Sequence, residues 1–151
     1  MNREFWNGKT VLITGHTGFK GSWLTLWLKK VGEKVIGFSK DIPTKPSLFE
    51  LADISNNINS IEGDIRNYDE IRDVIKKTKP EVVFHMAAQS LVRFSYTNPR
   101  ETYETNVMGT VNLMDALRKQ KNVHVIINVT SDKCYENKEL ERGHMEDDQL
   151  G

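Results

Sequence analysis

The stretch Thr10–Gly21, TVLITGHTGFKG, predicts a short buried strand, a glycine-rich turn and the beginning of a helix. Gly15, Gly18 and Gly21 lack the Cβ atom that would block a tight turn, a ligand phosphate near the backbone, or close packing of helix on strand. A helix that begins at such a turn presents free N–H groups and the positive end of its dipole. The G-x-x-G-x-x-G spacing is a weak signal alone, but the flanking strand and helix indicate a phosphate-binding loop.

Composition narrows the class of protein. The chain has 151 residues, enough for one domain, and its 21 acidic and 21 basic residues give a formal net charge of zero. This balance argues against nucleic acid or an anionic membrane bound through bulk charge. The sequence has no apolar run of membrane-spanning length, its first residues do not resemble a signal peptide, and its single cysteine, Cys134, is typical of a reducing compartment. We therefore expect one cytoplasmic domain over residues 1–151, without nucleic-acid, membrane or metal partners.

Strands and helices alternate along the chain. Strands are expected at 10–14, 34–38, 58–62, 82–85 and 123–130. Helices are expected from Gly21 to Gly32, from Asn67 to Pro80 and from Asn98 to about Gln120, with a short turn near 47–51. This pattern predicts an α/β fold with a doubly wound, three-layer parallel sheet of Rossmann type, in strand order 3-2-1-4-5. Ligands bind such sheets at the carboxyl ends of the strands, where the order reverses.

Local patterns predict how the helices begin and pack. Asn67 and Glu70 have the spacing of a capping box. The buried face of the first long helix is expected to carry Leu24, Trp27, Leu28 and Val31. That of the last is expected to carry Tyr103, Asn106, Val107, Thr110, Leu113, Met114 and Leu117. Gly109 lies inside this helix at a cost of about 1 kcal/mol relative to alanine, which predicts close packing against a neighbour.

Motifs at the expected ligand edge resemble those of extended short-chain dehydrogenases/reductases. With 14–21, they are GDIR at 63–66, HMAAQ at 85–89 and NVMGT at 106–110. The sequences of residues 15–24, 46–50 and 130–135 are similar to those of the branch of this family that dehydrates CDP-glucose. The resemblance, which covers about residues 8–151, implies a bound NAD that takes a hydride from the sugar C4. Water is then lost across C5 and C6, and the hydride returns to C6. It also implies a homo-oligomer, usually a dimer.

The resemblance also implies which residues form the site. The cofactor-binding set is Gly15, His16, Thr17, Gly18, Phe19, Lys20, Gly21, Ser39, Asp64, Ile65, Ala87, Ala88, Gln89 and Asn106. Ser131 would hydrogen-bond the reacting C4 oxygen, Asp132 would protonate the leaving C6 hydroxyl, and Lys133 would act as a base or stabilise an enolate. The family's Tyr-x-x-x-Lys pair is absent. We therefore expect the N-terminal, cofactor-binding part of a longer enzyme, inactive on CDP-glucose by itself.

The choice between NAD and NADP stays open on the residues alone. Ser39 stands where many relatives have the acid that holds the ribose 2′-hydroxyl, and Ser39 with Lys40 would suit a 2′-phosphate. Asp41 lies two residues further on and would suit the ribose, and the resemblance favours NAD. His16 fits a loop side chain better than a catalytic one, and Asn106 fits a structural role as well as a catalytic one.

Other functions fit the same motifs. Another sugar-nucleotide 4,6-dehydratase or an epimerase of the family is one alternative, and a non-catalytic dinucleotide-binding protein is another. The pair Asp132-Lys133 speaks against an epimerase, which needs no acid and base at C5 and C6. If the sheet stops after about the fifth strand, apolar surface beside that strand should be exposed, which predicts self-association.

Overall fold

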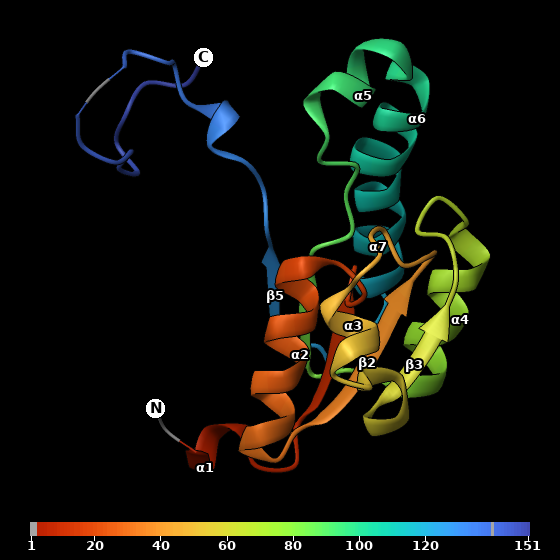
Figure 1. The fold of residues 1–151 in the computed structure, drawn as a ribbon. Helices are drawn as coiled ribbons and strands as arrows, with labels where there is room; N and C mark the ends of the chain where they lie inside the picture. The colour runs from red at the N-terminus through yellow and green to blue at the C-terminus, as the bar shows by residue number, and fades with distance from the viewer. Residues whose placement is uncertain (1–2, 140) are drawn as a thin grey trace.

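The computed structural model describes residues 3–139 and 141–151, with the backbone alone for residues 3, 4 and 132. Five parallel strands form one sheet, β1 Thr10–Thr14, β2 Lys34–Ser39, β3 Asn59–Glu62, β4 Val82–His85 and β5 Val125–Asn128. Their spatial order is β3-β2-β1-β4-β5, as predicted (Figure 1). Thr14 pairs with Phe38 and His85, so the carboxyl ends of the three central strands lie level.

Helices cover both faces of the sheet (Figure 1). The bounds are α1 Arg3–Trp6, α2 Phe19–Val31, α3 Leu48–Leu51, η1 Ile54–Asn57, α4 Tyr68–Thr78, α5 Val92–Thr97, α6 Pro99–Tyr103, η2 Glu104–Met108, α7 Gly109–Leu117 and η3 Asp132–Cys134. Both faces of β1 are covered, so successive side chains are buried on alternate sides of the sheet. Leu12 packs with α4 and α7, whereas Val11 and Ile13 pack with α2. The predicted three-layer arrangement is confirmed.

Helix α2 packs on the sheet through a face of small residues. Gly21, Ser22, Thr25 and Leu28 are its buried residues, whereas Trp27 is 45% exposed, so the prediction that Trp27 is buried was wrong. The hydroxyl of Thr25 donates to the carbonyl of Gly21 (2.8 Å) and that of Ser22 donates to the carbonyl of His16 (3.1 Å). These hydroxyls are satisfied locally, so the small residues let the helix lie close to the strands, while Leu28 packs against Val11 and Ile13.

The segment expected as one helix from Asn98 to Gln120 is interrupted. Residues 104–108 of this segment form a π-helical turn. A further short helix, α5, lies before Asn98. Leu113 and Leu117 are buried as predicted, but Tyr103 is 69% exposed. A π turn adds a residue to the helical repeat, so the face that is buried after the turn differs from the face before it. The close packing predicted at Gly109 is confirmed, because a Cβ there would lie 2.7 Å from Cγ2 of Ile65.

The N-terminus of α4 differs in detail from a capping box. The side chain of Asn67 accepts from the N–H groups of Asp69 and Glu70, as expected of a cap. Glu70 turns away from the backbone of Asn67 and accepts from the N–H of Asp64 (2.8 Å). The helix start is thereby attached to the loop that follows β3.

Beyond β5 the chain leaves the sheet, and residues 131–139 and 141–151 lie apart from it in Figure 1. Val125, Ile126, Ile127 and Val129 are each about two fifths exposed, so the expected apolar surface beside the fifth strand is present. In the described part of the chain, no helix is both long and apolar enough to span a membrane.

Candidate functional site

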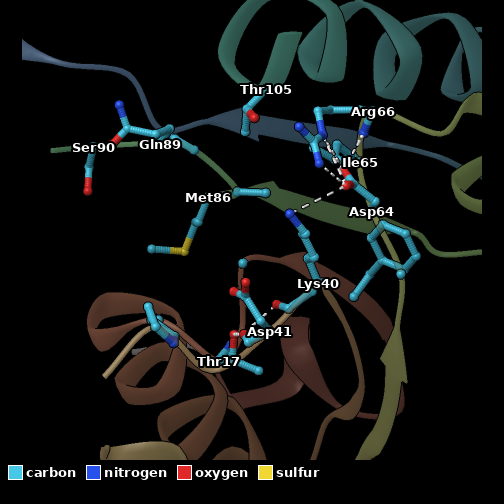
Figure 2. Close-up of a pocket in the computed structure, with 18 of the residues that line it drawn as sticks. Thr17, Lys40, Asp41, Asp64, Ile65, Arg66, Met86, Gln89, Ser90 and Thr105 are labelled. Atoms are coloured by element: carbon cyan, nitrogen blue, oxygen red, sulfur yellow. Dashed lines mark hydrogen bonds and ion pairs between the residues drawn. The ribbon is translucent and has the colours of Figure 1, made fainter. Parts of the chain in front are cut away.

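A cavity of about 300 Å³ lies where the carboxyl ends of β1, β2, β3 and β4 meet. The loops that follow these strands supply most of its lining (Figure 2). Of the predicted cofactor residues, the cavity is lined by Gly15, Thr17, Gly18, Ser39, Asp64, Ile65, Ala87, Ala88 and Gln89. Residues far apart in the sequence are thus brought together at the edge where parallel strands place a ligand.

The glycine loop is folded tightly onto the end of β4. Gly15 has φ +75°, and a Cβ there would lie 2.7 Å from the backbone of Met86 and of Ala87. A Cβ on Gly21 would lie 2.1 Å from the carbonyl oxygen of Gly15. Gly18 is the N-cap of α2, no side chain caps the helix, and its first turn has no acidic residue. An uncapped helix start beside a cavity is suited to an anionic ligand.

His16 lies beneath the loop and does not line the cavity. Its ring nitrogens contact two hydroxyls, Nδ1 to Oγ of Ser39 (2.8 Å) and Nε2 to Oγ of Ser60 (2.7 Å). The ring lies against Gly37, where a Cβ would be 2.2 Å from it, and edge-on to Phe49. Burial lowers the pKa of His16 to about 4, against a smaller opposing effect of a backbone hydrogen bond, so the imidazole is neutral at pH 7. The structure therefore gives His16 a packing and hydrogen-bonding position.

Ser39 lines the cavity, but its hydroxyl is already engaged. Besides contacting His16, the hydroxyl oxygen accepts from the N–H of Thr17 (3.4 Å), and only 8% of Ser39 is exposed. Asp41 is held nearby through its carbonyl, which accepts from the hydroxyl of Thr17 (2.6 Å). Among the described residues, the Asp41 carboxylate has neither a hydrogen-bond nor an ion-pair partner. Asp41 is thus the better placed of the two to receive a ligand hydroxyl.

Charged side chains gather on the opposite wall of the cavity. Asp64 accepts from Nε and Nη2 of Arg66, at 2.6 to 3.0 Å, and Nζ of Lys40 lies 4.0 Å from its carboxylate. In Figure 2, Lys40 reaches across toward Asp64, while Asp41 lies beside Thr17. The hydrogen bonds from Arg66, opposed by burial, hold the pKa of Asp64 below its usual value. Ile65 is buried beside this pair, which leaves an apolar wall next to an ionised carboxylate.

The loop after β4 is attached to the helix that covers it. The side-chain amide of Asn106 accepts from the N–H of Gln89 (2.7 Å) and donates to its carbonyl (2.9 Å). Gln89 in turn donates through Nε2 to the hydroxyl of Thr102 (3.0 Å). Asn106 lies outside the cavity lining and fixes Gln89, which does line it.

Other predicted site residues lie outside the cavity lining. Phe19 is 74% exposed, Lys20 is exposed on the first turn of α2, and Gly21 is buried under the loop. Ser131 and Lys133 are exposed beyond β5, where the N–H of Lys133 donates to the hydroxyl of Ser131 (3.2 Å). The side chain of Asp132 lies outside what the structure describes. The described residues form no cluster of three or more His, Cys, Asp or Glu suited to a metal ion.

The cavity also has lining residues beyond the predicted cofactor-binding set, although the sequence already suggests Lys40 and Asp41 for the ribose or its phosphate. They are Phe38, Lys40, Asp41, Pro43, Gly63, Arg66, Met86, Ser90, Leu91, Glu101 and Thr105. Lys40, Gly63, Arg66 and Met86 directly flank predicted site residues, so adjacency was a usable signal. No local signal points to Glu101 and Thr105, because they reach the cavity from α6 and the π turn.

A family model described as GDP-mannose 4,6 dehydratase matches residues 12–149. The chain belongs to this family. Over its whole length it is 51% identical to the CDP-glucose 4,6-dehydratase of Salmonella typhimurium, of which it covers 42%. It is 35% identical over 127 residues to the CDP-paratose 2-epimerase of Salmonella typhi, covering 83% of this chain and 37% of that one. The chain thus spans about two fifths of the length of these relatives.

Solved structures of nucleotide-sugar epimerases share the fold. A UDP-glucose-4-epimerase from Stenotrophomonas maltophila with bound NAD matches with a TM-score of 0.81 at 22% identity, over 95% of this chain and 43% of that one. The UDP-glucose 4-epimerase of Thermus thermophilus in complex with NAD matches with a TM-score of 0.79 at 25% identity, over 94% and 44%. The predicted resemblance to extended short-chain dehydrogenases/reductases and the Rossmann-type fold are both confirmed.

Proposed function

We propose that this chain is the cofactor-binding part of a CDP-glucose 4,6-dehydratase and that its cavity binds NAD. The observation that carries the proposal is the meeting of the glycine loop, the uncapped start of α2, Asp41 and Asp64 around one cavity. Support comes from the 51% identity to the Salmonella enzyme and from the NAD named in related solved structures. We propose that the pyrophosphate lies on the glycine loop and the adenine beside Asp64 and Ile65.

The engagement of Ser39 favours NAD over NADP. A 2′-phosphate needs donors, but the Ser39 hydroxyl is occupied by His16 and by the N–H of Thr17. The carboxylate of Asp41 would accept from a ribose 2′-hydroxyl and repel a 2′-phosphate. Lys40 is drawn to within 4.0 Å of Asp64, on the opposite wall.

Titration calorimetry with NAD and with NADP tests the proposal. We expect NAD to bind at least tenfold more tightly, and Asp41→Asn to reduce that preference by about fivefold or more because the acid that distinguishes the two riboses is lost. Asp147→Asn, in the exposed loop beyond β5, is the matched control and should leave the ratio unchanged. Equal affinity of the wild-type chain for both dinucleotides would contradict the assignment of Asp41, and no binding of either would contradict the proposed function.

The dehydration chemistry is assigned to the segment after β5. A bound nicotinamide would accept the hydride from C4 and return it to C6. Within that proposal Ser131 holds the C4 oxygen, Asp132 protonates the departing C6 hydroxyl, and Lys133 either takes the C5 proton as a base or, where another group takes that proton, stabilises negative charge on the enolate. The 151 residues contain no Tyr-x-x-x-Lys pair, so full turnover of CDP-glucose requires residues that the sequence does not include.

A further inference from the structure

A chain of buried and partly buried hydrogen bonds runs from β1 through β4 to the helix above the cavity. Oγ1 of Thr14 lies 2.7 Å from Nδ1 of His85, and Nε2 of His85 lies 2.9 Å from Oγ1 of Thr110. The hydroxyl of Thr110 donates to the carbonyl of Asn106 (2.7 Å). Thr14 and His85 are almost completely buried, so water does not compete for the contact between them, whereas the two contacts of Thr110 are partly buried.

The direction of every bond in this chain follows from the proton that each hydroxyl carries. Thr110 gives its one proton to Asn106, so toward His85 it accepts, and the ring proton lies on Nε2. Nδ1 is then an acceptor and takes the proton of the Thr14 hydroxyl. The oxygen of Thr14 remains free to accept from the N–H groups of Met86 and Ala87, both at 3.2 Å. One neutral tautomer of His85 therefore satisfies all the groups.

The segment held by this chain lines the cavity. Met86 and Ala87 are attached to Thr14, and Gln89 is attached at its N–H and carbonyl to Asn106, the residue that Thr110 contacts. The backbone of Met86 and Ala87 also lies directly against Gly15, where even a methyl group would be 2.7 Å away. A small shift of the segment would therefore change the fit between the glycine loop and the end of β4.

We propose that His85 is a positioning residue: its Nε2–H tautomer joins Thr14 to Thr110 and fixes residues 86–89 against the glycine loop. His85 does not line the cavity itself, and it acts through Thr14 and Thr110. The consequence for dinucleotide affinity rests on the proposed function, whereas the placement of residues 86–89 does not.

Three variants separate this role from general stability. Thr110→Val removes the acceptor for His85, and Thr110→Ser keeps it. Thr78→Val is the matched control, because the Thr78 hydroxyl donates to the carbonyl of Val74 (2.7 Å) in the same i to i−4 geometry, on α4 and outside the cavity lining. All three retain the full 151-residue chain, and Thr110→Ser keeps the test valid if Thr110→Val fails to fold.

Nitrogen-15 NMR of the wild-type protein should show His85 as the neutral Nε2–H tautomer. In Thr110→Val, the amide of Ala87 should exchange about tenfold faster and NAD should bind about tenfold more weakly, while Thr110→Ser restores both and Thr78→Val changes neither; the amide of Met86, which also donates to the Thr14 carbonyl (3.1 Å), should change less. A proton on Nδ1, or unchanged amide exchange in Thr110→Val, would overturn the proposal. Absence of NAD binding by the wild-type chain would refute the proposed function instead, and the exchange rates would still decide the role of His85.

Discussion

Two buried neutral histidines predict that the protein loses stability in mild acid. His16 and His85 are 1% and 2% exposed, and burial lowers the pKa of each to about 4. Each ring contacts two hydroxyl groups and no carboxylate among the described side chains, so protonation would place a charge without a counter-ion inside the fold. Between pH 6.5 and 4 the unfolded chain binds protons on both residues that the native state does not bind.

The sign and size follow from proton linkage. Because the folded-state pKa is below the unfolded value, the free energy of unfolding falls as pH falls through 6.5, and the loss is complete near pH 4. From pH 7.5 to 5.0, a shift from 6.5 to about 4 costs about 2 kcal/mol for each histidine, or about 4 kcal/mol together. This is a large share of the 5–15 kcal/mol that is typical of a domain.

Carboxylates also change the free energy of unfolding with pH, in different directions, and their effects must be separated from those of the histidines. Burial raises the pKa of Glu33, against a smaller opposing effect of Lys9. The contribution of Glu33 to the free energy of unfolding therefore rises on acidification, in the opposite direction to that of the two histidines. Its two carboxylate oxygens are buried without a well-formed hydrogen bond from any described residue, so Glu33→Gln removes this opposing contribution. Asp64 and Glu81 have lowered pKa values, so their stabilising contributions begin to be lost as pH falls into the range in which carboxylates ordinarily titrate and are fully lost below their folded-state pKa values, mostly outside the pH 7.5 to 5.0 window.

Urea unfolding followed by circular dichroism between pH 7.5 and 5.0, in the Glu33→Gln background, measures the effect. Adding His85→Gln should remove about half of the slope, because one of two equal contributions is lost. Ile75→Val, a buried substitution without a titrating group, should lower the free energy of unfolding by about 1 kcal/mol at every pH and leave its slope against pH unchanged. A loss below about 1 kcal/mol over this range, or the same slope with and without His85, would refute the reasoning.

Two further predictions concern the glycine loop and the exposed edge. Gly15→Ala should lower the free energy of unfolding by about 3 kcal/mol or more, because its Cβ would meet the Met86 backbone. Gly8 has a similar φ of +76° but open space around it, so Gly8→Ala should lower the free energy of unfolding by only about 1 kcal/mol. Equal losses for the two variants in urea unfolding would contradict this prediction. The exposed β5 edge should make the chain self-associate as concentration rises in sedimentation velocity, and Ile126→Lys should weaken this, whereas Leu51→Lys on α3 should not; a monomer throughout would contradict it.

The sheet was predictable because its signals are local. Each central strand is an apolar run bounded by glycine or polar residues, and the glycine turn after Thr14 places the first helix. The interrupted helix was not predictable in the same way. Apolar spacing assumes a constant 3.6-residue repeat, and the π turn at 104–108 breaks that repeat; in the sequence, the Gly109 that follows it indicates a packing position and not the end of a π turn. This is why Tyr103 is exposed although it lies in the predicted stripe.

The candidate site was predictable to the extent that strand ends define it. Gly15, Asp64 and Ala87 follow three different strands, and parallel pairing alone brings them to one edge. The state of the Ser39 hydroxyl was not accessible in this way. It depends on where His16 points, and His16 occupies a position in the glycine loop where a cofactor contact was an equally natural expectation.

The absence of a side chain at Gly37 explains how His16 reaches that position. Gly37 lies in β2 beside Ser60 of β3. A Cβ on Gly37 would lie 2.2 Å from the imidazole, so the ring fits only because this strand residue has no side chain. Seated there, the ring contacts Ser60 through Nε2 and engages Ser39 through Nδ1. If the cavity binds NAD as proposed, the choice of ribose contact passes from Ser39 to Asp41 because of a glycine that lies outside the cavity lining. Cofactor preference in this fold is then set partly by packing within the sheet, since that packing determines which polar group at the end of β2 is left available.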